Sequence, residues 1–98
     1  MELNVPLPHD AFIQMARPFR FQWEPAQDCF VILYPEGMVK LNQAAGLILN
    51  LCCKHNQSLA QTVESLAQDF GQEPQSIQDD VQEFLRIAHD NRWIELRQ

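Results

Sequence analysis

Apolar and polar residues alternate strictly over residues 19–24, where the sequence is FRFQWE. A period of two is typical of a β-strand that buries one face, so this pattern predicts a half-buried strand. The buried face would carry the aromatic residues Phe19, Phe21 and Trp23, and the opposite, charged face would be exposed to water.

The next apolar run is CFVILY at residues 29–34, and it is apolar on both faces. Such a run predicts a central strand that is covered on both sides. The helices would cover one face, and either Phe12 and Ile13 or a second protomer would cover the other. The sequence YPEG at residues 34–37 is typical of a type I turn, which would lead into a short edge strand at residues 38–41.

The second half of the chain predicts three amphipathic helices. Asn42 can cap a first helix that runs to about Lys54. Ser58 and Gln61 have the spacing of a capping box and begin a second helix, and Pro74 begins a third and longest one. The apolar positions expected to face the core are Ala45, Ile48, Leu49 and Cys52, then Leu59, Val63, Leu66, Ala67 and Phe70, and finally Ile77, Val81, Phe84, Leu85 and Ala88.

The two ends of the chain carry weaker patterns. Residues 1–16 show no strand or helix periodicity apart from the apolar group Phe12, Ile13 and Met15, so we interpret them as an N-terminal arm. Residues 93–96, WIEL, would form a short extended tail whose tryptophan is packed.

At 98 residues the chain fits one domain, with residues 17–98 folded behind the arm of residues 1–16. Three strands followed by three helices predict an α+β, winged-helix-like fold: a three-stranded antiparallel sheet and a three-helix bundle. No apolar run approaches the roughly 20 residues that span a bilayer, and the first residues do not resemble a signal peptide. We therefore expect a soluble, cytoplasmic protein without membrane contact.

The residue types that carry catalysis are present without the spacing that catalysis needs. The three cysteines and three histidines are not arranged as metal ligands, and Asp79 and Asp80 are helix neighbours that point in different directions. The three glycines are isolated, so no phosphate-binding loop is formed. The sequence predicts no catalytic residue, no metal site, no cofactor and no enzymatic activity.

Charge argues against the nucleic-acid binding that a winged helix can perform. The net charge is −6, and the stretch from His55 to Leu85, which holds the second and third helices, contains no lysine or arginine. Its acidic residues are Glu64, Asp69, Glu73, Asp79, Asp80 and Glu83. A DNA-reading helix needs cations opposite the phosphates, so we expect no nucleic-acid partner.

The predicted edge strand offers a different kind of binding. An edge strand has unpaired N–H and C=O groups that bind an added strand, as in peptide recognition by strand addition. Because side chains alternate, Val39 and Leu41 would face the core, while Met38 and Lys40 share the other face. Lys40 would either meet an acidic side chain of a peptide or serve only as an edge charge that discourages aggregation.

Several of these segments together resemble the PqqD family of pyrroloquinoline quinone (PQQ) biosynthesis. They are RFQWEPAQ, ILYPEGMVKLN with Ala44-Ala45 and Ile48-Leu49, and DVQEFL, and the likeness runs from about Arg17 to Leu96. The resemblance implies a peptide chaperone, a RiPP recognition element, that binds the precursor peptide PqqA and presents it to PqqE, a radical S-adenosylmethionine (SAM) enzyme. The implied peptide-binding residues are Met38, Val39, Lys40, Leu41, Asn42, Val81, Phe84, Leu85 and Ala88.

A second hypothesis from another class is an assembly subunit that uses its exposed sheet edge only to form a homodimer. The two hypotheses differ in what perturbs the edge. Added peptide would perturb the amides of residues 38–42 in the first case, and dilution alone would perturb the sheet in the second.

Overall fold

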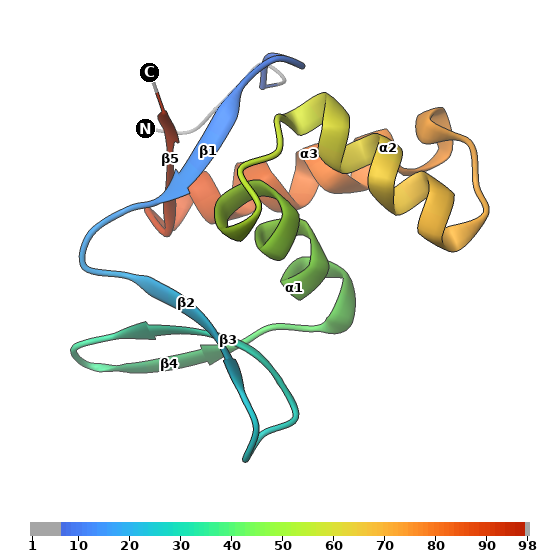
Figure 1. Ribbon diagram of the computed structural model, residues 1–98. Helices are drawn as coiled ribbons and strands as arrows, with labels where there is room; N and C mark the ends of the chain where they lie inside the picture. The colour runs from blue at the N-terminus through green and yellow to red at the C-terminus, as the bar shows by residue number, and fades with distance from the viewer. Residues whose placement is uncertain (1–6, 98) are drawn as a thin grey trace.

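The computed structural model describes residues 7–97 of the chain, which form two small sheets and a helical layer between and beside them (Figure 1). The elements in chain order are β1 (Phe12–Met15), β2 (Arg20–Glu24), β3 (Cys29–Tyr34), β4 (Gly37–Lys40), α1 (Gln43–Leu49), the π-helical turn η1 (Asn50–Lys54), α2 (Leu59–Phe70), α3 (Pro74–Asp90) and β5 (Ile94–Arg97).

The larger sheet is antiparallel and has the order β2-β3-β4, so the prediction of a three-stranded meander with β3 at its centre is confirmed. Tyr34 pairs with Gly37 across the turn, as the YPEG sequence predicts. Three helices accompany this sheet, and the α+β prediction is therefore confirmed.

Both faces of β3 are closed within a single chain. Ile32 is fully buried and belongs to the core formed with the helices. Val31, on the opposite face, is also fully buried, and its cross-strand neighbours are Gln22 and Lys40. Ile13 joins the helical core instead of this second face, and because Val31 is buried within one chain, no second protomer is required to cover it.

A second sheet joins the two ends of the described chain, and the sequence did not predict it. β1 pairs antiparallel with β5, from Phe12 opposite Arg97 to Met15 opposite Ile94. Ile13 is only 1% exposed. The prediction that residues 1–16 lack a strand is therefore wrong for β1, while residues 1–6 lie outside the described part of the chain.

The helix boundaries follow the predicted local signals. The Asn42 side chain accepts a hydrogen bond from the Ala45 N–H at 2.8 Å, and both halves of the capping box of Ser58 and Gln61 are formed. Pro74 is the first residue of α3. The first helix does reach Lys54, but its last turn widens into η1.

Two aromatic residues that were expected in the core are exposed. Trp23 is 46% exposed and Phe70 is 47% exposed, so both predictions are wrong. Each lies at or next to the end of its element. The periodic pattern of the sequence continues to that point, but the neighbouring element that would cover the side chain has already ended. Trp23 instead packs edge-on against Phe30, with ring centroids 5.1 Å apart.

Candidate functional site at the free edge of β4

The backbone of β4 has a free side. The Leu41 N–H donates to the Phe30 carbonyl at 3.0 Å, which makes this pair a hydrogen-bonded one. Hydrogen-bonded and non-bonded pairs alternate along an antiparallel ladder. Val39 therefore directs its N–H and C=O toward β3, whereas Met38 and Lys40 direct theirs outward, to the side where β4 has no partner strand among residues 7–97.

The side chains of β4 alternate as the sequence predicts. Val39 packs against the core, and Leu41, just after the strand, is 7% exposed. Met38 is 39% exposed on the other face, and Lys40 is exposed as well. We call the outward main-chain groups of Met38 and Lys40, with the side chains around them, the β4 edge.

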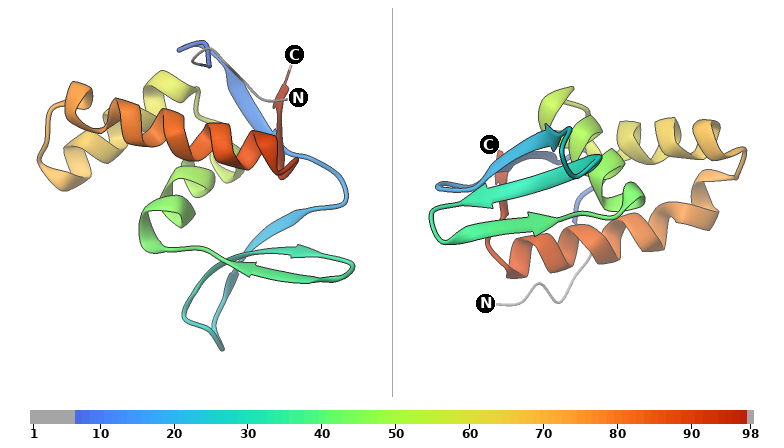
Figure 2. Two further views of the ribbon diagram at one scale, coloured as in Figure 1. Left: turned by 180° about the vertical axis from the view of Figure 1, so that it is seen from behind. Right: turned by 90° about the horizontal axis from the view of Figure 1, so that it is seen from below.

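Helix α3 lies on the side of the sheet that ends with β4. Seen from below, the three strands follow one another in the order β2, β3, β4, and α3 comes next beyond β4 (Figure 2, right). The two strand edges face opposite sides of the molecule, and α3 lies on the β4 side in this view, at a different level from the sheet (Figures 1 and 2).

The structure divides the α3 residues named from the sequence into two groups. Val81, Leu85 and Ala88 are at most 2% exposed, so they support the helix from the core and are not accessible to a ligand. Phe84 is only partly buried. Of these four predicted residues, Phe84 alone has surface to offer a peptide.

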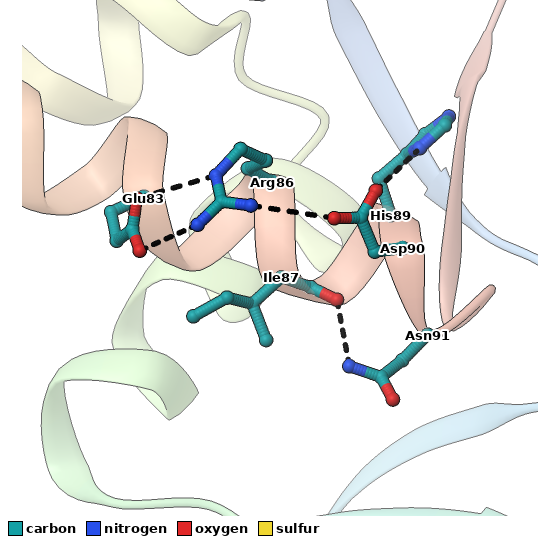
Figure 3. A network of polar contacts seen from close by, with 6 residues as sticks. All are labelled: Glu83, Arg86, Ile87, His89, Asp90 and Asn91. Atoms are coloured by element: carbon teal, nitrogen blue, oxygen red, sulfur yellow. Dashed lines mark hydrogen bonds and ion pairs between the residues drawn. The ribbon is translucent and has the colours of Figure 1, made fainter. Parts of the chain in front are cut away.

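Ile87 is an accessible α3 residue that the sequence reasoning missed. It is 41% exposed, and it lies three residues after Phe84, on the same flank of the helix. Figure 3 shows Ile87 pointing to the side of the helix on which Asn91 also lies, and the Asn91 side chain donates to the Ile87 carbonyl at 2.8 Å. The sequence signal for Ile87 is its spacing of three residues from Phe84, which places both apolar side chains on one flank of the helix.

The solvent face of α3 is a network of charges. Arg86 forms ion pairs with Glu83 at 2.7 Å and with Asp90 at 3.4 Å (Figure 3). Arg86 is the one arginine of α3, and its charge is paired in this network. Asp79 and Asp80 are exposed. Helix α3 is therefore acidic on its solvent face and apolar on the flank of Phe84 and Ile87.

Asn42 and the cysteines have structural surroundings. The acceptor oxygen of Asn42 is used in capping α1. Burial raises the pKa of the Cys52 thiol, which lies 3.3 Å from the Thr62 hydroxyl, and burial also raises the pKa of Cys53 to about 12. Both thiols are therefore neutral at physiological pH and are poor nucleophiles.

Within residues 7–97, no three histidine, cysteine or acidic side chains gather as a metal site. No helix in this part of the chain has the length and apolar character needed to cross a membrane.

The fold matches that of a known class of domains. The solution NMR structure of the PqqD truncation of Methylobacterium extorquens PqqCD superimposes with a TM-score of 0.70, covering 88% of this chain and 89% of that one at 23% identity. That protein is described as a functional, stand-alone recognition element for ribosomally synthesized and post-translationally modified peptides (RiPPs). The present chain has the fold of such a RiPP recognition element.

Sequence comparisons give the family. The model of the family "Coenzyme PQQ synthesis protein D (PqqD)" matches residues 29–94. The PqqA binding protein of Azotobacter vinelandii is 52% identical over 83 residues, which cover 85% of this chain and 88% of that protein. The PqqA binding protein of Pseudomonas aeruginosa strain UCBPP-PA14 is 49% identical over 88 residues, or 90% and 94% of the two chains. The chain belongs to the PqqD family.

Proposed function

We propose that this protein binds the precursor peptide PqqA by strand addition at the β4 edge and presents it to the radical SAM enzyme PqqE in the cytoplasm. The protein performs no catalysis itself in this proposal. Its relatives in Azotobacter and Pseudomonas are named for PqqA binding, which supports the choice of ligand.

One observation carries the proposal: the free main-chain groups of Met38 and Lys40 lie on an edge strand that has no partner among residues 7–97, on the side of the sheet on which α3 lies. An added strand gains affinity from main-chain hydrogen bonds and selectivity from neighbouring side chains. Ile87 and the accessible part of Phe84 supply apolar contacts on the α3 side. The other predicted residues have supporting roles. Val39 and Leu41 pack against the core on the inner face of the strand, and Asn42 caps α1.

A two-dimensional amide NMR titration with synthetic PqqA tests this function. We expect saturable shifts at Met38, Lys40, Phe84 and Ile87, and unchanged amides at Phe70, which lies at the far end of α2. No shifts at about 1 mM peptide, which corresponds to a binding free energy weaker than about −4 kcal/mol, would reject the proposal.

Presentation to PqqE requires a separate measurement. Cross-link formation in PqqA by PqqE would be followed with the wild-type protein and with a variant that folds but no longer binds PqqA. We expect the variant to lose the stimulation, and equal stimulation by both would show that delivery of the peptide does not depend on this edge.

Homodimerisation through the β4 edge is the competing function, because any extended chain can pair with an open edge. Amide spectra over a hundredfold dilution distinguish the two. Shifts of Met38 and Lys40 on dilution without peptide would favour the dimer, whereas unchanged spectra would leave the edge free for PqqA.

A further inference from the structure

The three-stranded sheet has a second free edge, which belongs to β2. Because Phe30 bonds to Leu41, its main-chain groups point toward β4, and those of Val31 point toward β2. Val31 pairs with Gln22, so Gln22 directs its backbone inward. Phe21 and Trp23 then direct their N–H and C=O groups outward, and β2 has no partner strand on that side among the described residues.

A depression with a volume of about 430 Å³ lies along this edge. It is lined by Met15, Arg20, Phe21, Gln22, Cys53 and Lys54, so β1, β2 and η1 all contribute. The side opposite η1 belongs to α3 and the β4 edge (Figure 2, right). This depression is therefore distinct from the proposed PqqA site.

The lining combines a neutral floor with two cations. Met15, Phe21 and Cys53 are partly buried and pack against the core. The Cys53 thiol stays uncharged, because burial raises its pKa to about 12. Arg20 and Lys54 are both exposed at the rim, and within residues 7–97 neither has an ion-pair partner.

These cations contrast with the acidic second and third helices. The chain has a net charge of −6, and the second and third helices carry only one arginine, which is already paired with Glu83 and Asp90. Two unpaired cations beside a strand edge favour a ligand with carboxylates and repel a basic one. The widened turn η1 brings Cys53 and Lys54 to this depression, and such turns recur at functional sites.

We propose that the β2 edge is a second docking site, which binds an acidic, extended segment of a partner protein. The segment adds as a strand through the outward main-chain groups of Phe21 and Trp23. Its apolar side chains contact the floor of Met15, Phe21 and Cys53, and its carboxylates pair with Arg20 and Lys54. Because the site lies on the other side of the sheet from the β4 edge, both ligands can be bound at once.

The test uses a capped hexapeptide in which valine and glutamate alternate, and its counterpart with glutamine in place of glutamate. Both are titrated into the full-length ¹⁵N-labelled protein. We expect the acidic peptide to shift the amides of Phe21, Trp23, Cys53 and Lys54, and the glutamine peptide to bind at least about fivefold more weakly. The difference should shrink as salt rises from about 20 mM to 0.5 M.

Variants separate the charge effect from the fold. Arg20→Gln with Lys54→Gln should remove the preference for the acidic peptide, and because both side chains are exposed the protein should stay folded. The matched control is Arg92→Asn, which removes an exposed positive charge elsewhere and places a residue that tolerates the φ of 65° found there. It should retain the preference.

Three results would overturn the docking site. These are equal binding of the two peptides, shifts at Met38 and Lys40 in place of the β2 edge, and no shifts at about 5 mM acidic peptide. None of the three depends on whether PqqA binds at the β4 edge.

Discussion

The free edge of β4 faces the side of the molecule on which α3 lies, whereas the free edge of β2 runs beside η1. Both edges expose main-chain groups of alternate residues, Met38 and Lys40 on one and Phe21 and Trp23 on the other. Their surroundings differ. On the β4 side, α3 has the apolar side chains of Phe84 and Ile87 and an acidic solvent face. On the β2 side, η1 contributes Lys54 to a depression whose other lining residues include uncharged side chains.

If the two edges bind their ligands as proposed, this difference allows one small sheet to separate them. Main-chain hydrogen bonds are the same on both edges and do not distinguish one extended peptide from another. In this proposal the choice of ligand comes from the flanking element, through apolar contact at the β4 edge and through charge at the β2 edge. Four substitutions test this division.

Proline at an inward-facing position should damage the sheet itself. Val39→Pro removes an N–H that bonds to β3 and leaves a buried carbonyl without a donor, so we expect a loss of about 1–3 kcal/mol in unfolding free energy. Urea denaturation followed by circular dichroism measures it. Met38→Pro is the control, because the N–H that it removes points outward. Equal losses for the two variants would contradict the assignment of the hydrogen-bonded pairs.

Proline at the outward-facing position should instead separate the two edges. Met38→Pro should weaken PqqA binding about tenfold, or about 1.4 kcal/mol, and leave the acidic peptide's affinity for the β2 edge unchanged. Isothermal titration calorimetry with each peptide measures both affinities. Met38→Ala, which retains the N–H, controls for the lost side chain, and an equal loss at both edges would show that they are not independent.

The apolar flank of α3 should contribute a smaller part of PqqA affinity. Ile87→Ser removes a partly exposed apolar side chain, so we expect about a fivefold loss, or about 1 kcal/mol. Phe70→Ser is the control, because Phe70 is similarly exposed but lies at the end of α2. If both variants bind PqqA like the wild type, the peptide does not contact α3 at Ile87.

Charge on the β4 edge should matter least. Lys40 is exposed, so Lys40→Glu should change the free energy of PqqA binding by less than about 1 kcal/mol. Fluorescence anisotropy at low and high salt with labelled PqqA measures the change. A change of several kcal/mol would show that Lys40 becomes buried against the peptide.

Local signals in the sequence predicted local structure well. The cap at Asn42, the capping box at Ser58 and the turn at residues 34–37 each depend on neighbours within four residues, and all three are present. The central position of β3 was also readable, because a strand that is apolar on both faces has to be covered on both.

Long-range pairing and accessibility were not predictable in this way. β1 and β5 are four residues each and pair across about eighty residues of chain, so neither carries a pattern long enough to identify it. The apolar stripe of α3 predicts which face of the helix is buried. It does not predict how much of the neighbouring helix surface the packed elements also cover. The stripe predicted correctly that Val81 faces the core, where it is 2% exposed, but it gave no indication of Ile87, which lies outside the stripe and is 41% exposed.

The β1–β5 ladder has a mechanical consequence. Its outermost pair is Phe12 with Arg97, whose guanidinium lies 4.9 Å from the centre of the phenyl ring, and both strands leave the ladder at this end. Tension applied to the two chain ends in opposite directions would therefore act on one cross-strand pair of the ladder at a time. It would not act on all four pairs together, as shear would. The first part to open under tension would be this seam, while the three-stranded sheet and both of its edges stayed unloaded.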